Sequence, residues 1–306
     1  MRAQPIHTPR QAYVYVGLAI AGWSTVATAF KMALHTLDAW QLLCGASLAS
    51  TVVLALATAW QGKISLLRQQ TAAQLRLSAL QGLLNPCGYY VLLFLAYARL
   101  PAQAALALNY VWPLALAVLA VPVLGERLRL KTVVALGISL LGVWLIVSGG
   151  DWRTLQVADP WGVGLALGSA LVWAVYWLTN VRDRRDGVVK LTWAFVFGSV
   201  YTLLLLPVMS TLRWPTPTET FWLTYIGTAE MGLTFVCWLR GLELAVNRGS
   251  LANAVYVAPF LSLLLIALVL RETIAPTSVL GLGIIIASIV WQSRVARPDR
   301  DPSSSA

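Results

Sequence analysis

Ten long apolar runs dominate the sequence, and they constrain the fold more than any other feature. The hydrocarbon core of a bilayer is about 30 Å thick, so a helix that rises about 1.5 Å per residue needs roughly 20 residues to cross it. Runs of this length leave room only for short loops. The sequence therefore predicts an all-α integral membrane protein with ten transmembrane helices, at residues 13–31, 40–60, 75–97, 102–124, 132–148, 160–180, 191–210, 221–238, 250–270 and 275–291.

The composition indicates that lipid is the surrounding solvent. Charged residues make up 11% of the chain, against about 25% in soluble domains, and the mean hydropathy is +0.73. The net charge of +10 does not indicate nucleic-acid binding, because the basic residues sit singly or in small groups between apolar runs. The expected partner is therefore the lipid bilayer, and no nucleic acid is expected.

The basic residues also predict how the helices are oriented. When the loops are assigned alternately to the two sides of the membrane, 17 of the 22 Lys and Arg fall on the side that holds both termini. The positive-inside rule places that side in the cytoplasm. We therefore expect a multi-pass protein of the bacterial inner (plasma) membrane with both termini cytoplasmic. A cleaved signal peptide is the alternative for the first run, because residues 27–29 resemble a small-residue cleavage site.

The chain contains an internal repeat. Each half holds five predicted crossings, an odd number, so the second half enters from the opposite side and the repeat is inverted. The predicted organisation is a cytoplasmic tail over 1–12, a first repeat over 13–149, an inverted second repeat over 150–293 and a disordered cytoplasmic tail over 294–306. The residues that align between the halves are Trp23 with Trp173, Tyr110 with Tyr256, Val111 with Val257, Pro113 with Pro259, Glu126 with Glu272 and Gly137 with Gly283.

An inverted repeat favours a secondary transporter. Two similar halves of opposite orientation can exchange conformations and open a site at the membrane midplane to each side in turn. The sequence therefore predicts a central cavity and alternating access. A receptor or membrane scaffold is a remote alternative, because a scaffold gains nothing from pseudo-symmetric access.

Glu230 is the only carboxylate near the middle of a predicted span. A charge at that depth costs at least about 2.5–3.5 kcal/mol, so its side chain should face a cavity or a partner. It is a candidate for proton coupling or for contact with the ammonium group of a substrate. The alternative is a structural carboxyl that only makes hydrogen bonds.

Three prolines predict breaks inside the helices. Pro86 follows Asn85 at a depth similar to that of Glu230, and Pro113 and Pro259 lie mid-span in the fourth and ninth runs. Proline removes a backbone donor and frees a carbonyl group, and such breaks often line transporter sites. We interpret the three prolines as hinges and Asn85 as a substrate-binding residue. Fixed structural kinks are the alternative.

Aromatic and polar side chains at middle depth complete the candidate binding site. Aromatic rings can stack on a flat or cationic substrate, and hydroxyl and amide groups can fix its orientation. Packing against other helices or lipid is the alternative for each ring. The candidate substrate-binding residues beside Asn85 and Glu230 are Trp23, Tyr89, Tyr90, Asn109, Tyr110, Trp112, Trp173, Trp177, Asn253 and Tyr256.

An enzyme is not expected. No predicted span contains Asp or His, so paired aspartates and a histidine base are excluded there. The two histidines of the chain cannot form a multi-histidine metal centre, and no GxxxxGK[ST] loop for nucleotides is present. We therefore expect no cofactor, no metal and no catalytic residue.

The chain resembles the drug/metabolite transporter superfamily of the EamA type. In that superfamily two five-helix repeats each end in a helix with a mid-span Pro and a terminal Glu, followed by a Gly-rich last span. Arg271 stands where this family often has Gly. The matching stretches are ALNYVWPLALAVLAVPVLGERL with GISLLGVWLIVSGG, and NAVYVAPFLSLLLIALVLRET with GLGIIIASIVWQS.

The resemblance and the aromatic residues together indicate the kind of substrate. The many mid-span aromatics are similar to those of aromatic amino acid exporters of the YddG type. This implies export of amino acids, aromatic or neutral, or of related small metabolites. A multidrug or aromatic-cation exporter of the same fold is the alternative, and the sequence leaves both proton coupling and facilitated diffusion open.

Overall fold

The computed structural model describes residues 9–125, 130–149, 159–245, 251 and 253–295, and no strand occurs in them. Within these residues, eight helices or helix runs are long and apolar enough to cross a membrane, which confirms a multi-pass helical fold. They are α1 (Pro9–Ala33), α2 (Ala39–Trp60), the run of α4 (Ala72–Gly82), η1 (Leu83–Gly88) and α5 (Tyr89–Arg99), the run of α6 (Ala102–Asn109) and α7 (Trp112–Leu124), α8 (Leu130–Val147), α9 (Pro160–Arg182), α10 (Gly187–Met209), and the run of η2 (Asn253–Val257), α14 (Ala258–Leu265) and η3 (Ile266–Leu270).

The described residues hold four further helices outside these eight runs. They are α3 (Ile64–Arg68), α11 (Pro217–Ala229), α12 (Leu233–Leu244) and α15 (Pro276–Val295). The pair α11 and α12 covers the predicted eighth run and α15 covers the tenth. Glu126 and most of the two predicted tails lie outside the described residues.

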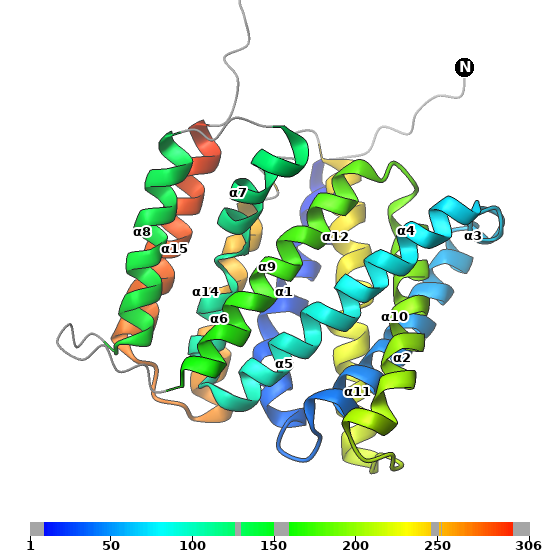
Figure 1. Ribbon diagram of the computed structural model, residues 1–306, viewed down its shortest axis with the longest axis horizontal. Coiled ribbons are helices and arrows are strands. Elements are labelled where there is room, and N and C mark those ends of the chain that lie inside the picture. Colours follow the sequence, from blue (N-terminus) through cyan, green and yellow to red (C-terminus); the bar gives the residue numbers. More distant parts are fainter. Residues whose placement is uncertain (1–8, 126–129, 150–158, 246–250, 252, 296–306) are drawn as a thin grey trace, which may run out of the picture.

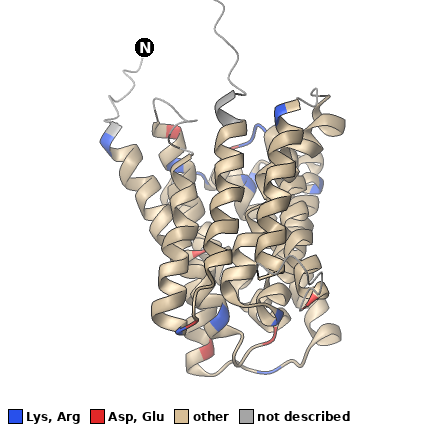
Figure 2. Cartoon of the chain, turned by 90° about the vertical axis from the view of Figure 1, so that its left-hand side faces the viewer, with Lys and Arg blue, Asp and Glu red and all other residues tan. Residues whose placement is uncertain are grey.

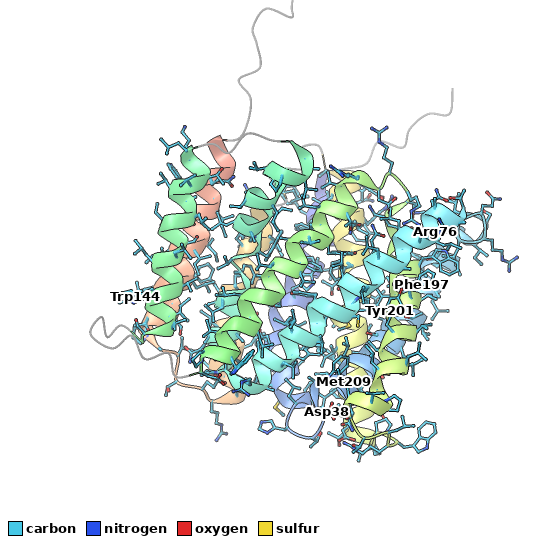
Figure 3. The ribbon with its side chains drawn as sticks, viewed as in Figure 1. Asp38, Arg76, Trp144, Phe197, Tyr201 and Met209 are labelled. Atoms are coloured by element: carbon cyan, nitrogen blue, oxygen red, sulfur yellow. The ribbon has the colours of Figure 1, made fainter. Side chains whose placement is uncertain are left out.

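The charged residues gather at the two ends of the helices and leave the middle band almost free of them (Figure 2). The apolar side chains of the outer helices point away from the bundle, as Trp144 on α8 and Met209 on α10 do (Figure 3). These two side chains belong to residues that are 38% and 52% exposed. A belt of exposed apolar residues between two charged ends is what a bilayer requires of a protein that it surrounds.

The helices form a bundle with three parts (Figure 1). At one edge α8 packs along α15, and at the other edge α2 packs against α10 and α11. Between them α1 contacts α12 and α14, and α9 contacts α5 and α7. The described part of α1 begins at the same end of the bundle at which α15 ends (Figure 1).

Close backbone contact holds the α4–α10 edge together. A Cβ atom added at Gly198 would lie 2.4 Å from Cδ of Pro86, and one added at Gly82 would lie 2.4 Å from the carbonyl oxygen of Ala194. Glycine is therefore required where α10 crosses the run of α4 and η1. Membrane helices commonly use small residues to approach each other in this way.

Local capping fixes where several helices begin. Asp38, Thr71 and Thr216 each cap a helix by accepting from the backbone N–H three residues on, and the side chain of that third residue accepts from the cap in return. Asp186 caps α10 through the N–H groups of Val188 and Val189. These boxes satisfy backbone donors at helix ends that no intrahelical bond can reach.

The helices break near the predicted prolines, but the breaks come before Pro113 and Pro259. Helix α6 ends at Asn109, and Pro113 lies in the first turn of α7. Pro259 likewise lies in the first turn of α14, after the 3-10 segment η2. Proline fits the first turn of a helix because its missing N–H would have no partner there. The interruptions thus lie just before Pro113 and Pro259, and the role of these prolines as hinges stays a prediction.

Two further breaks lie in the third and eighth runs. Asn85, before Pro86, has φ −144° and ψ 117°, far from helical values. Glu230 and Gly232 separate α11 from α12, and Gly232 has φ −112° and ψ −96°. The predicted single helix over 221–238 is therefore two helices, because the backbone turns at Gly232.

The two halves share a further backbone detail. Gly125 ends α7 with φ 71° and ψ 19°, and Arg271 ends η3 with φ 55° and ψ 27°. Both are in the left-handed conformation that commonly ends a helix and that favours glycine. Arg271 is thus an unusual residue in an ordinary helix-ending conformation.

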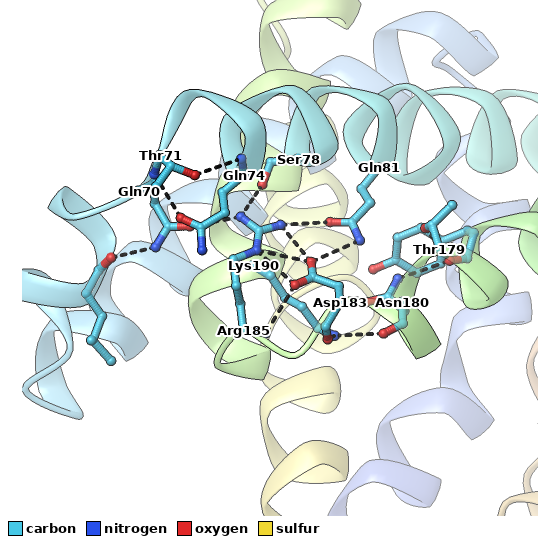
Figure 4. Close-up of polar contacts among 12 residues, drawn as sticks. Gln70, Thr71, Gln74, Ser78, Gln81, Thr179, Asn180, Asp183, Arg185 and Lys190 are labelled. Atoms are coloured by element: carbon cyan, nitrogen blue, oxygen red, sulfur yellow. Dashed lines mark hydrogen bonds and ion pairs between the residues drawn. The ribbon is translucent and has the colours of Figure 1, made fainter.

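A buried polar cluster joins α4 to the segment between α9 and α10 (Figure 4). Asp183 and Arg185 form a bidentate ion pair, with 2.9 Å from Nε to Oδ1 and 2.7 Å from Nη2 to Oδ2. Their side chains are 2% and 8% exposed. Arg185 also donates to Ser78 Oγ over 2.9 Å, and Gln81 donates to Asp183 Oδ2 over 3.3 Å. Burial raises the pKa of Asp183, but its bonds to Arg185 outweigh this, so the pKa lies below its usual value.

We predict that Arg185→Met lowers the free energy of unfolding by about 3–5 kcal/mol, because it leaves the Asp183 carboxylate buried without its cation. Thermal unfolding of the purified protein, followed by size-exclusion fluorescence, measures this. Arg240→Met is the matched control, since Arg240 and Glu243 form an exposed ion pair, and it should change little.

The same pair predicts a dependence on pH. A carboxyl with a depressed pKa stabilises the fold above its unfolded pKa of about 4, and that stability is lost as the pH falls through the folded pKa. Asp183→Asn should therefore reduce the loss of stability on acidification. If Arg185→Met unfolds like the wild type, the pair does not stabilise the fold.

Candidate functional site

A central cavity of about 350 Å³ lies among α1, α5, α6, α7, α9, α12 and η2. Its volume is in the range typical of sites for small molecules. Most of its wall is aromatic or aliphatic. The residues that line it are Trp23, Val26, Phe30, Tyr89, Leu93, Tyr97, Leu106, Asn109, Tyr110, Trp112, Leu116, Trp173, Trp177, Glu230, Phe235, Trp238, Leu242, Asn253, Val255 and Tyr256.

The structure brings ten of the twelve predicted binding residues to this wall. Asn85 and Tyr90 are the two that it places behind the wall, and both are 0% exposed. Tyr90 still reaches the site, because its hydroxyl donates to Glu230. Asn85 lies near the hydroxyl of Tyr176 but makes no hydrogen bond of normal geometry among the described residues. Asn85 itself carries the non-helical backbone angles of η1, between the helical segments α4 and α5.

The sequence prediction missed several aromatic residues of the wall, including Phe30, Tyr97, Phe235 and Trp238. A signal for them exists in helical spacing. Phe30 follows Trp23 by seven residues and Tyr97 follows Tyr89 by eight, so each lies about two turns along the same helix face. Extending each predicted residue along its face would have found Phe30 and Tyr97.

Glu230 lies where α11 ends and is 6% exposed. Its Oε1 accepts from the hydroxyl of Tyr90 over 3.0 Å. Its Oε2 has no hydrogen-bond partner among the described residues. One oxygen is therefore held in place, and the other is buried with its hydrogen-bonding capacity unused.

Stacked aromatic rings form the wall near the centre of the molecule. Tyr89 stacks on Trp173 with 4.5 Å between ring centroids, and Trp173 stacks on Tyr176 at 5.2 Å. Trp112 and Trp177 lie parallel within 17° at 6.3 Å. Four of these rings line the cavity, those of Tyr89, Trp112, Trp173 and Trp177. They come from three helices, so the wall depends on how α5, α7 and α9 pack together.

Hydrogen bonds tie part of the wall to its neighbours. Tyr89 donates to Asn109 Oδ1 over 3.2 Å, and Asn109 donates to Ser169 Oγ over 2.9 Å. Asn109 ends α6, so this chain of bonds fixes the break between α6 and α7 against α9. Both polar atoms of the Asn109 amide are thus already used within the protein.

Contacts between the two halves lie at one end of the cavity. The N–H of Ala102, at the start of α6, donates to Glu272 Oε1 over 3.2 Å. Gln103 donates to the carbonyl of Thr273 over 3.0 Å and accepts from the N–H of Ala275 over 2.9 Å. Beside them Phe30 packs edge-on against Phe94, with centroids 4.8 Å apart. These contacts join α6 to the segment before α15.

The described residues contain no group of three or more His, Cys, Asp or Glu side chains that could hold a metal ion. Cys44, Cys87 and Cys237 are free thiols. The chemistry that the cavity offers is therefore that of aromatic faces, a few amide and hydroxyl groups, and one carboxyl group.

These features define a multi-pass helical membrane protein with an internal aromatic cavity. The family follows from the sequence, because the EamA-like transporter family matches residues 10–148 and again residues 160–294. The chain belongs to this family, which confirms the resemblance found in its motifs. Family membership makes it a membrane transporter.

Individual relatives are more distant. The chain is 27% identical over 214 residues to the aromatic amino acid exporter YddG of Ancylobacter novellus, covering 68% of this chain and 71% of that protein. It is 27% identical over 55% of its length to an uncharacterized transporter of Clostridium kluyveri, and 26% identical over 66% to one of Synechocystis. The matches span 56% and 61% of these two relatives.

A solved crystal structure is similar in fold. It superposes with a TM-score of 0.64 at 24% identity, and the match covers 93% of this chain and 96% of the other. At this identity the likeness extends to the arrangement of helices alone. It agrees with the family match in placing nearly the whole chain in one fold.

We predict that Tyr90→Phe slows transport, because it removes the only described donor to the buried Glu230 carboxyl. Leaving a buried acceptor unpaired costs about 1–3 kcal/mol, so thermal stability should fall as well. Tyr201→Phe is the control, since the Tyr201 hydroxyl bonds the carbonyl of Ala79 away from the cavity. Transport by Tyr90→Phe at the wild-type rate would show that the hydrogen bond does not position Glu230.

Proposed function

We propose that this protein is a secondary transporter that exports amino acids, aromatic or neutral, or related small metabolites, by alternating access. The observation that carries the proposal is the central cavity, in which one carboxyl group faces an aromatic wall. Membership of a transporter family supports it, as does the likeness to an aromatic amino acid exporter over 214 residues. The substrate would lie against the rings, with its amine beside Glu230.

The proposal includes ten crossings in two inverted repeats, over 13–149 and 150–293. The family matches the chain twice, and α11 with α12 and α15 would supply the two additional crossings. The left-handed ends at Gly125 and Arg271 support the correspondence of the halves, as do Pro113 and Pro259, each in the first turn of a restarted helix. Both tails, over 1–12 and 294–306, would be cytoplasmic in the bacterial inner membrane.

The alternating movement would use the broken helices. Pro86, Pro113 and Pro259 lie at or just after breaks that border or support the cavity, so a small rotation at each break would tilt a half-helix without breaking a regular hydrogen-bond ladder. The contacts of Gln103 with Thr273 and Ala275 would close one end in this conformation. They would part when the cavity opens to that side.

Glu230 would couple transport to protons by exchange. A carboxyl group in apolar surroundings is stable when protonated or when paired with a cation, and unstable when charged and alone. A proton and a substrate ammonium therefore compete for the free oxygen. Release of the amine to one side and uptake of a proton from that side would reset the site.

A second candidate, export of aromatic cations or drugs, is favoured by the same carboxyl group and rings. Such a substrate carries no carboxylate, so the site needs no cation to pair with one. A membrane scaffold or receptor is less well supported, since neither role requires an internal cavity.

The first experiment is counterflow in liposomes that contain the purified protein, with labelled amino acids and aromatic cations, with and without a pH gradient. We predict selective flux of aromatic amino acids or amines, and loss of the response to the gradient in Glu230→Gln. Glu243→Gln is the control, because Glu243 forms an exposed ion pair with Arg240. Absence of flux for every solute would contradict the proposed substrates, and an unchanged response in Glu230→Gln would contradict its role in coupling.

The topology has its own test in cells. In a background without Cys44, Cys87 and Cys237, Trp214→Cys should react with an impermeant maleimide from outside, because Trp214 is 95% exposed in a loop proposed to be external. Ser65→Cys, in the exposed helix α3, should react only after permeabilisation. Five proposed crossings separate the two positions, so labelling of both from the same side would contradict the ten-span arrangement.

A further inference from the structure

The charges around the cavity are unbalanced in a way that bears on its substrate. Glu230 is the only Asp, Glu, Lys, Arg or His among the described residues that line it. Lys31 follows the lining residue Phe30 on α1, but its electrostatic partner is Glu272. An ammonium group in the cavity thus has a carboxylate to meet, whereas a carboxylate finds no cation among the described residues of the wall.

Three neutral donors near Glu230 are committed to the protein itself, whereas the indole N–H of Trp177 on the same wall has no hydrogen-bond partner among the described residues. The Tyr90 hydroxyl donates to Glu230, and the Tyr89 hydroxyl donates to Asn109. The Asn109 amide in turn donates to Ser169. A carboxylate placed beside these groups would lose its water without gaining a strong partner, and it would also meet the like charge of Glu230.

The aromatic wall adds to the preference for a cation. Rings attract cations through their faces, and this attraction is larger where water is excluded. Trp173, stacked between Tyr89 and Tyr176, is 7% exposed, so its surroundings are largely dry. The same faces repel an anion.

We propose that the cavity recognises an aromatic ring and an amine and does not recognise a carboxylate, so that aromatic amines and the amides of aromatic amino acids are ligands at least as good as the amino acids. This inference rests on the proposed function and narrows its substrate class. The amine binds the Glu230 carboxyl group, which lines the cavity and has one oxygen without a partner among the described residues, and the ring lies against the wall that contains Trp173. The carboxyl end of an amino acid points away from Glu230.

The test is a binding series of four ligands that share one ring. Phenylalanine carries both charges, phenethylamine and phenylalaninamide carry only the amine, and 3-phenylpropionate carries only the carboxylate. Calorimetry at pH 7 with the purified full-length protein measures each dissociation constant without requiring transport. We expect phenethylamine and phenylalaninamide to bind at least as tightly as phenylalanine. We expect 3-phenylpropionate to bind roughly tenfold or more weakly than phenethylamine, because one charge-assisted hydrogen bond supports a factor of this size.

Glu230→Gln should weaken the binding of phenethylamine by roughly tenfold. It should leave the binding of 3-phenylpropionate unchanged or make it slightly tighter, since the repelling charge is gone. Glu243→Gln should change neither. The series with the wild-type protein is decisive by itself, so the inference stays falsifiable if Glu230→Gln does not fold.

Two results would overturn the inference. One is binding of phenylalanine at least tenfold more tightly than both phenethylamine and phenylalaninamide, which would show that the carboxylate is recognised. The other is absence of binding by all four ligands. Counterflow separates these failures from failure of the proposed function, because flux of phenylalanine together with the reversed binding order would refute the inference and support the transporter. The expected binding order without any flux would support the recognition and refute transport.

Discussion

The need to satisfy every backbone hydrogen bond in lipid governs this structure. In hydrocarbon an unpaired N–H or C=O group costs several kcal/mol, so helices that face lipid have to be regular. Helices α2 and α10 at one edge and α8 at the other continue without a break. The described interruptions fall in runs that other helices surround, and three of them, at Tyr110, at Glu230 and in η2, border the cavity. Irregular backbone and binding site thus coincide, because only the interior of the protein tolerates both.

The charged groups of the molecule differ between the helix ends and the cavity. The ion pairs at the helix ends, such as Asp183 with Arg185, are complete and hold loops to helices. Glu230 differs because half of its carboxyl group has no partner among the described residues. A complete ion pair buried at the midplane would be inert toward a ligand, and an unpaired carboxyl group leaves a vacancy that a proton or an amine can fill. The interior therefore holds few polar groups, and the carboxyl group of Glu230 is the one that can bind a proton or an amine.

Most of the fold and much of the candidate site could be predicted from the sequence, since both follow from periodicity and depth. The apolar runs, and the aromatic residues at their centres, could be identified because a helix surrounded by lipid needs about 20 mostly apolar residues. The position of Tyr90 and Asn85 behind the wall could not be predicted. Neighbouring residues point about 100° apart on a helix, and the break at Asn85 changes the phase between α4 and α5. The sequence did not predict the split of the eighth run, because a single glycine such as Gly232 can adopt helical or non-helical backbone angles.

Arg271 shows how the two halves can differ in sequence while keeping one geometry. A left-handed residue other than glycine costs roughly 1–2 kcal/mol, so this conformation must be imposed by its surroundings. The residues that follow supply them, because Glu272, Thr273 and Ala275 all bond to the first turn of α6. Those bonds need the chain to turn sharply after η3, and the left-handed residue provides the turn. The departure from glycine at this position is thus compatible with the family fold, and the hydrogen bonds of the following residues to α6 hold it in place.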